Sequence, residues 1–316
     1  MYKYLIVLPV LAIVASGCVT FHAGAPPGVI DVIAHRGASH DAPENTMAAF
    51  RLAYDMGADW FELDCYLTSD DAVVVIHDAT LERTTGVQGR VVDSDLAYLR
   101  TLDAGSWKAP DFAGEPLPTL GEALDFAKHK IGVYVEIKNM NDDSALMAHL
   151  LDLASGHPIL TPELARRVMT AVEASGTRNL ELTRKCIALI RARHMERDIV
   201  IQSFSPIICA VARIEAPEMR VELLSGVEAD KHADWEMTLR WAYLLDVDGL
   251  NLSGKGLTPG RLAVAQASGK SVAVWTINHP ADMRRFAAWG VNAIITDRPD
   301  LCLRALGRQG RRLQDR

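Results

Sequence analysis

The chain has 316 residues, of which 49% are hydrophobic, and its formal net charge at pH 7 is −7. Binding to nucleic acid relies on a strongly basic surface, so this charge argues against nucleic acid as a partner. The five cysteines include no C-x-x-C pair, and their spacing predicts no zinc framework. The length is long for one ordinary domain but normal for an α/β barrel.

The first residues predict an export signal. Lys3 precedes the apolar run Tyr4–Ala15, which is shorter than the roughly 18–20 residues of a membrane-spanning helix. The run ends in Ala15-Ser16-Gly17-Cys18, which resembles the processing site of bacterial lipoproteins, where the cysteine is lipidated. We therefore expect a signal peptide at residues 1–17, a lipid on Cys18 and a tether at residues 18–28. An ordinary cleaved signal with an incidental cysteine is the alternative.

This signal also predicts where the protein works. We expect it to be exported to the periplasmic side of a bacterial cell envelope and held at a membrane through Cys18. At the other end of the chain, residues 304–316 are rich in arginine, and we expect them to form a solvated basic tail.

Strands and helices alternate along the rest of the chain. The first strand, Val29–Ala34, is followed by a helix that opens at Pro43–Thr46. Asn45 or Thr46 suits the N-cap of this helix, and Gly57 suits its end.

A short connection separates the next two strands. The strands are Trp60–Tyr66 and Val73–His77, and only Ser69–Ala72 lies in the turn between them. A parallel pair needs a crossover of about a dozen residues. We therefore expect Val73–His77 to fold back as an antiparallel hairpin outside the barrel count.

The remaining pattern predicts a barrel. Residues 78–118 are rich in glycine and proline, which is typical of a long functional loop. Helices are expected at Leu120–His129, over most of Asp142–Glu173, and at Leu180–His194, Asp234–Leu244, Pro259–Ser268 and Pro280–Trp289. The parallel strands start near residues 29, 60, 132, 199, 220, 249, 271 and 293. Eight such βα units predict a TIM-type (β/α)8 barrel, with an irregularity at the crossover from 199 to 220, which looks short for a full helix.

Four polar clusters stand at the ends of apolar strands. They are His35-Arg36-Gly37, Glu62-Leu63-Asp64, His77-Asp78 and Glu136-Ile137-Lys138. Charged side chains are costly to bury without partners, so four such clusters predict a functional site rather than separate surface salt bridges. The carboxyl ends of barrel strands are also where barrel enzymes carry their sites.

The residue types in these clusters suit metal-assisted acid–base chemistry. Glu62 and Asp64 share one face of their strand because residues i and i+2 point the same way, and Glu136 can join them. Three carboxylates can hold Ca²⁺ or Mg²⁺, and the sequence does not choose between the two ions. His35 and His77 titrate near neutral pH and can exchange protons with substrate oxygens.

Together these motifs resemble the glycerophosphodiester phosphodiesterase family. Besides the four clusters, the matching segments are Pro43-Glu44-Asn45-Thr46, Arg83-Thr84-Thr85-Gly86, Gln202-Ser203-Phe204, Val274-Trp275-Thr276-Ile277-Asn278 and Thr296-Asp297-Arg298-Pro299. The resemblance extends from Val29 to about Leu301. It implies a TIM barrel over residues 29–303 with a small insertion at about 79–119. It also implies hydrolysis of glycerophosphodiesters to an alcohol and glycerol 3-phosphate.

The resemblance further implies a role for each matched residue. Glu62, Asp64 and Glu136 match the family's metal ligands, and His35 and His77 match its acid–base pair. Phosphate contacts fall on Arg36 and Lys138. Glu44 is expected to support the metal site from outside the ligand set. Trp275 matches an aromatic residue that lines the glycerol pocket, although a purely packing role in the barrel is the alternative.

Two other functions stay open from the sequence. One is a phosphodiesterase for a larger lipid or polymer substrate, such as a lysophospholipase D, whose acyl chain would need an apolar rim near Trp107, Phe112 or Trp235. The other is a lipoprotein that binds glycerophosphodiesters without turnover. The oligomeric state and any disulfide pairing of the remaining cysteines are not determined, but Cys65 is expected to point away from the site into the core.

Overall fold

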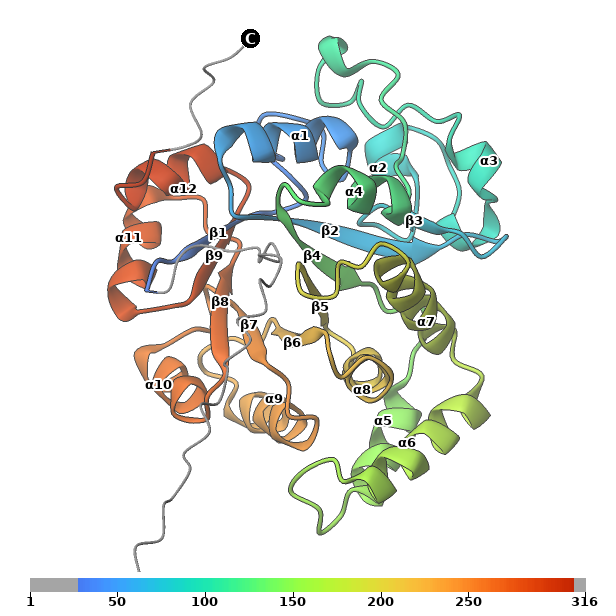
Figure 1. The fold of residues 1–316 in the computed structure, drawn as a ribbon, viewed down its shortest axis with the longest axis vertical. Coiled ribbons are helices and arrows are strands. Elements are labelled where there is room, and N and C mark those ends of the chain that lie inside the picture. Colours follow the sequence, from blue (N-terminus) through green and yellow to red (C-terminus); the bar gives the residue numbers. More distant parts are fainter. Residues whose placement is uncertain (1–27, 310–316) are drawn as a thin grey trace, which may run out of the picture.

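Eight parallel strands close into a barrel that helices surround (Figure 1). The computed structural model describes residues 28–309, so the predicted signal peptide, Cys18 and nearly all of the tether lie outside the described residues. The barrel strands are β1 (Asp31–Ala34), β2 (Trp60–Leu67), β4 (Gly132–Ile137), β5 (Ile199–Ser203), β6 (Arg220–Ser225), β7 (Gly249–Ser253), β8 (Ser271–Trp275) and β9 (Ala293–Thr296). Pairing of Ile33 with Trp60 joins β1 to β2 and closes the barrel. The predicted TIM-type barrel is confirmed.

The predicted hairpin is also confirmed. Strand β3 (Val73–Val75) pairs antiparallel with the end of β2, from Cys65 opposite Val75 to Leu67 opposite Val73. The insertion packs on this hairpin and contains α2 (Glu82–Thr85), α3 (Leu96–Leu99) and two single turns of 3-10 helix at Val91–Asp93 and Pro110–Phe112. It has a small core of its own, built around Val74, Ile76 and Leu81.

The other helices cover the outside of the barrel. They are α1 (Met47–Met56), α4 (Leu120–Ala127), α5 (Ser144–Leu153), α6 (Pro162–Ser175), α7 (Arg178–Arg191), α8 (Pro206–Glu215), α9 (His232–Leu244), α10 (Pro259–Ala267), α11 (Pro280–Trp289) and α12 (Pro299–Ala305). As predicted, Thr46 caps α1 and Gly57 ends it with a left-handed φ of 89°. Within residues 28–309, no helix is both long and apolar enough to cross a membrane.

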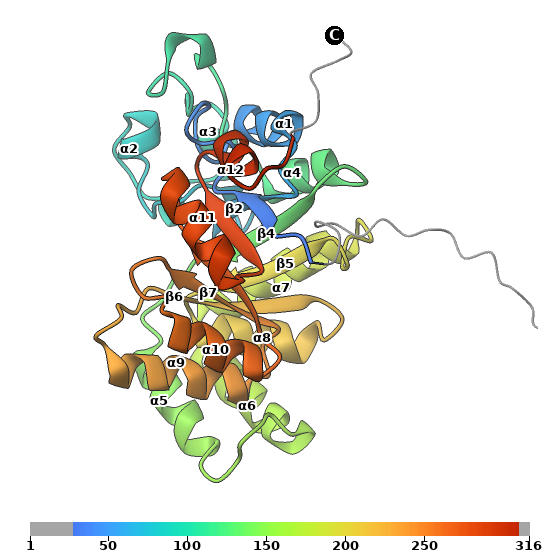
Figure 2. The same ribbon diagram turned by 90° about the vertical axis from the view of Figure 1, so that its left-hand side faces the viewer.

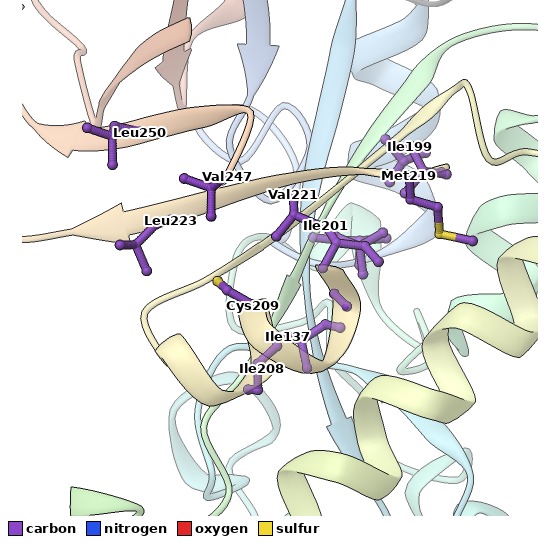
Figure 3. Close-up of a cluster of buried hydrophobic side chains, with 14 of the residues drawn as sticks. Ile137, Ile199, Ile201, Ile208, Cys209, Met219, Val221, Leu223, Val247 and Leu250 are labelled. Carbon is purple, nitrogen blue, oxygen red and sulfur yellow. The ribbon is translucent and has the colours of Figure 1, made fainter. Parts of the chain in front are cut away.

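The prediction of an irregular crossover between β5 and β6 was wrong. Helix α8 has 10 residues and returns alongside β5, which has 5. A helix rises about 1.5 Å per residue and a strand about 3.3 Å, so the two lengths match. Ser205 caps α8 and Pro206 opens it. Figure 3 shows Ile208 and Cys209 of α8 among the outward-facing side chains of β5 and β6, so the short crossover is fully packed.

Two excursions leave the barrel at opposite ends of the molecule. The insertion with α2 and α3 lies at one end, and α5 and α6 lie at the other (Figure 2). The single helical stretch expected over 142–173 is therefore two helices, because residues 154–161 break it with Gly156 and Pro158. Neither excursion interrupts the barrel strands.

Two aromatic side chains fill the barrel interior below the carboxylates. Toward the amino ends of the strands, Trp60 and Tyr134 fill the centre, with ring centroids 5.2 Å apart in an edge-on contact. One step further along the same inward rows stand Glu62 and Glu136, because alternate strand residues face the interior. Cys65 faces outward into the buried core, as expected, and the four cysteines of the described residues are free thiols.

The C-terminal segment is partly attached to the barrel. Helix α12 extends to Ala305. The two terminal guanidinium nitrogens of Arg308, Nη1 and Nη2, each donate to the Asp59 carboxylate at 2.7 Å. Arg308 also donates to the carbonyl of Ile30 at 2.8 Å. The remainder of the predicted tail, residues 310–316, lies outside the described residues.

Candidate active site

Three buried carboxylates converge at the carboxyl end of the barrel. Glu62 and Asp64 come from β2 and Glu136 from β4, and one oxygen of each lies within 4.8 Å of the others. Burial, together with the charges of Asp64 and Glu136, raises the pKa of Glu62 well above its usual range. One oxygen of Glu62 accepts from the backbone N–H of Arg36 at 2.9 Å, and the other is buried without a hydrogen-bond partner. An all-oxygen set with an unsatisfied, crowded carboxylate fits a hard divalent cation.

Two basic side chains stand beside these carboxylates. Lys138, just after β4, places Nζ at 2.6 Å from Glu136 and 3.2 Å from Asp64. Burial alone would lower the pKa of Lys138, but Asp64 and Glu136 raise it above its ordinary value. Arg36 lies with Nε at 3.4 Å from Asp64. Both predicted phosphate contacts are therefore in the site, paired with carboxylates.

The turn after β1 positions Arg36 by backbone geometry. Arg36 and Gly37 have left-handed φ values of 54° and 80°. A β-carbon at Gly37 would lie 2.6 Å from backbone and side-chain atoms of Ala49, so no larger residue fits beside α1. The turn therefore carries Arg36 over the carboxylates while α1 packs directly against it.

Glu44 contacts the basic residues rather than the metal-binding group. It accepts from Arg36 Nη1 at 2.8 Å and from two nitrogens of Arg83 at 2.8 Å each. Its neighbour Asn45 contacts a carboxylate directly: Nδ2 donates to Asp64 at 2.8 Å, and Oδ1 accepts from the Asp64 backbone N–H. Sequence reasoning missed Asn45, although it lies in the Pro43–Thr46 motif. Any effect of Glu44 on the carboxylates passes through Arg36.

Each candidate acid–base histidine has a carboxylate on its Nδ1. His35 Nδ1 lies 2.6 Å from Asp297, and His77 Nδ1 lies 2.7 Å from Asp78. An imidazole that donates through Nδ1–H to a carboxylate carries its lone pair on Nε2. The two carboxylates thus fix the tautomer and orientation of both rings.

The two carboxylates are held differently. Asp297 accepts from Ser39 at 3.1 Å and from Asn278 Nδ2 at 2.5 Å, both neutral donors. Burial raises the pKa of Asp297, but its bonds with His35, Asn278 and Ser39 lower it to about 2. Asp78 instead binds the cation Arg83, whose Nε lies 2.5 Å away. Its partner His77 has a lowered pKa because of burial and the nearby Lys138 and Arg36, which outweigh the opposing effect of Asp64.

A cavity of about 140 Å³ brings these groups together. Its polar lining is formed by His35, Arg36, Glu62, His77, Glu136, Lys138 and Gln202, and the rest of the lining by Phe204, Leu224, Trp275, Thr276 and Ile295. The Trp275 indole N–H donates to the carbonyl of Asn251 at 2.9 Å, and its ring meets Phe204 edge-on at 5.6 Å. The cavity therefore offers polar groups that suit an anion and aromatic and aliphatic groups that suit the carbon atoms of a substrate.

All predicted site residues of the barrel lie in or beside this cavity, whereas Cys18 falls outside the described residues. Sequence reasoning assigned no role to Asp297, Asp78 or Asn278. Their motifs were visible, but the His35–Asp297 contact joins positions 262 residues apart. Such a contact has no local signature in the sequence.

Comparisons with known proteins agree with this site. The model of the "Glycerophosphoryl diester phosphodiesterase family" matches residues 35–161 and 162–301. A glycerophosphodiester phosphodiesterase of Caldanaerobacter subterraneus subsp. tengcongensis is 32% identical over 281 residues, which cover 88% of this chain and 98% of that protein. One from Bacillus subtilis is 30% identical over 286 residues, covering 87% of this chain and 86% of that protein.

Solved structures show the same fold. A glycerophosphodiester phosphodiesterase from Agrobacterium tumefaciens superposes with a TM-score of 0.63 at 28% identity, covering 87% of this chain and 99% of that one. A phosphodiesterase from Oleispira antarctica, solved with the product sn-glycerol-3-phosphate, gives a TM-score of 0.70 at 24% identity over 88% of this chain and 96% of that one. The chain belongs to the glycerophosphoryl diester phosphodiesterase family, whose members are divalent-metal-dependent hydrolases.

Proposed function

We propose that this protein hydrolyses small glycerophosphodiesters to an alcohol and sn-glycerol 3-phosphate, with His35 and His77 as the acid–base pair. The observation that carries the proposal is the pair of carboxylate-bound histidines on one cavity with three converging carboxylates. This set provides proton transfer, charge neutralisation and anion binding within one small space.

Glu62, Asp64 and Glu136 are the residues that would hold the metal. A bound divalent ion would draw negative charge from the phosphoryl oxygens and make a nearby hydroxyl more acidic. Both Ca²⁺ and Mg²⁺ suit oxygen ligands, and the choice between them depends on how much the carboxylates can rearrange. Lys138 and Arg36 add positive charge for the phosphate from the same side.

The substrate itself supplies the first nucleophile. The glycerol of a glycerophosphodiester carries a hydroxyl beside its phosphoester. One histidine takes the proton of this hydroxyl through Nε2 as the oxygen attacks phosphorus, and the other gives a proton to the departing alcohol. A cyclic phosphate is left. Water then opens the ring with the two histidine roles exchanged, which restores both starting protonation states.

The two histidines have different surroundings. Asp297 faces His35 with its charge opposed only by neutral donors, so it stabilises the imidazolium that forms when His35 accepts a proton. The charge of Asp78 is instead shared with Arg83, so the two imidazoles differ in the carboxylate charge that faces Nδ1.

The charged surroundings of the cavity favour a polar substrate over a lysophospholipid. Of the aromatic residues that an acyl chain could contact, Trp235 is buried under the Arg261 guanidinium at 4.8 Å, whereas Trp107 on the insertion and Phe204 at the cavity are exposed. A neighbouring cavity of about 540 Å³, which shares Trp275 with the site, is lined by the charged residues Glu228, Lys255, Asp282 and Arg285. The complete acid–base pair likewise argues against a lipoprotein that only binds its ligand.

We propose the cell envelope as the location, with the lipid anchor at Cys18. The support is the sequence of residues 1–18, together with the entry of the chain at β1. β1 begins at the end of the barrel opposite the site, so the described part of the chain starts away from the cavity. The mature protein should carry acyl chains on Cys18 by mass spectrometry, and an unmodified N-terminus at another residue would contradict the anchor.

Replacement of either histidine tests the reaction. We expect His35→Ala and His77→Ala to abolish measurable release of glycerol 3-phosphate from glycerophosphocholine, because each removes a proton-transfer group. Metal binding, followed by calorimetry, should persist because neither histidine belongs to the carboxylate triad. Near wild-type turnover in either variant would refute the assignment.

The carboxylate partners should affect the rate more than substrate binding. Asp297→Asn and Asp78→Asn each replace an acceptor with an amide of the same size, so the imidazole loses its fixed tautomer. We expect kcat to fall by about 10- to 1000-fold with little change in KM. The Asp300→Asn variant, at a half-buried carboxylate whose ion pair with Arg304 lies outside the cavity lining, is the matched control. If kcat of Asp297→Asn and Asp78→Asn equals that of the control, the two carboxylates only pack beside the imidazole rings.

A further inference from the structure

A buried polar chain runs from the floor of the barrel to the cavity. It contains Arg220 and Glu222 of β6, Asn251 of β7 and Gln202 of β5. Arg220 Nη2 donates to Glu222 at 2.6 Å, and Asn251 Nδ2 donates to Gln202 Oε1 at 2.6 Å. The Asn251 side chain also lies near the Glu222 carboxylate and favours its charged form, although burial raises the pKa of Glu222 overall. The side chains of Glu222, Asn251 and Gln202 are almost entirely buried.

The chain fixes which end of the Gln202 amide faces the substrate. The Glu222 carboxylate, paired with Arg220, only accepts hydrogen bonds, which favours the NH2 end of Asn251 on its side, and Asn251 Oδ1 is buried without a hydrogen-bond partner. The same NH2 group then donates to Gln202, which has to present its oxygen. The Gln202 NH2 group is left without a hydrogen-bond partner among the described residues, and Gln202 lines the cavity. The cavity wall therefore carries an oriented, uncharged donor.

The position of this donor places it beside the anion-binding groups. In the sheet, Gln202 pairs with Glu136, which in turn pairs with Asp64. Asn251 is held from two directions, because its backbone carbonyl also accepts the indole N–H of Trp275. The same residue thus sets the orientation of Gln202 and of the aromatic wall.

We propose that the Gln202 amide donates a hydrogen bond to a non-bridging phosphoryl oxygen of the substrate, with Asn251 as its positioning residue. This assignment rests on the proposed function. A donor-only group suits an oxygen that only accepts, whereas a glycerol hydroxyl would use an acceptor as well. A fixed neutral donor also stabilises charge that develops on phosphorus oxygens without reorganising during the step.

Binding of inorganic phosphate tests the donor directly. With saturating Mg²⁺ or Ca²⁺, we expect calorimetry to show phosphate affinity reduced about tenfold in Gln202→Met, which keeps length but lacks the N–H, and reduced further in Gln202→Glu. Gln266→Met, far from the cavity on α10, is the matched control and should bind as wild type. Unchanged phosphate affinity in Gln202→Met, combined with weaker binding of glycerol 3-phosphate, would move the contact to the glycerol and overturn the proposal.

Measurements of turnover distinguish phosphate binding by Gln202 from a purely structural role of its side chain. Gln202→Met should lower kcat for glycerol 3-phosphate release more than it raises KM, with circular dichroism unchanged. Asn251→Leu removes the donor that holds the Gln202 oxygen, and the fall in kcat that it causes should not add to that of Gln202→Met in the double variant. Additive losses would contradict the positioning role. If wild type binds phosphate yet hydrolyses no glycerophosphodiester, the proposed function fails while the phosphate result still decides the role of Gln202.

Discussion

Three carboxylates buried within 4.8 Å of one another are the constraint around which this site is built. Their mutual repulsion and burial would favour protonation, as the raised pKa of Glu62 indicates. The fold answers with positive charge from Lys138 and Arg36 and with the amide of Asn45, and still leaves one oxygen of Glu62 unsatisfied. A divalent cation completes this arrangement, and an anionic substrate then meets an excess of positive charge. The apolar layer of Trp60 and Tyr134 beneath keeps the other end of the barrel closed.

Around this centre, secondary contacts adjust the groups that move protons. His35 and His77 have the same Nδ1 contact but different environments, because Asp297 is held by neutral donors and Asp78 by Arg83. Arg83 also binds Glu44, so the insertion is joined to the turn that carries Arg36. Across the cavity, Asn251 holds both Gln202 and Trp275. The site thus combines side chains at strand ends with residues of the turn after β1 and of the insertion.

Much of this could be predicted from local patterns. Alternation along β2 places Glu62 and Asp64 on one face, and the short turn before β3 excludes a parallel crossover, so both features follow from single segments. The prediction of an irregular crossover before β6 was wrong because it considered only the length of the connection. Ser205 and Pro206 are a capping signal that indicates a full helix there. Asp297, Asn45 and Asn251 act through partners on distant segments, and no local period reveals such contacts. The role of Glu44 was likewise visible only once Arg83 was placed beside it.

The most direct test of the account is release of glycerol 3-phosphate from glycerophosphocholine by the purified residues 18–316, measured after EDTA treatment and again after addition of Ca²⁺ or Mg²⁺. The account predicts loss of release with EDTA and its return with one of the two ions, because the carboxylates need a cation to bind and polarise the phosphate. Release that persists without metal, or none with either ion from folded protein, would contradict it.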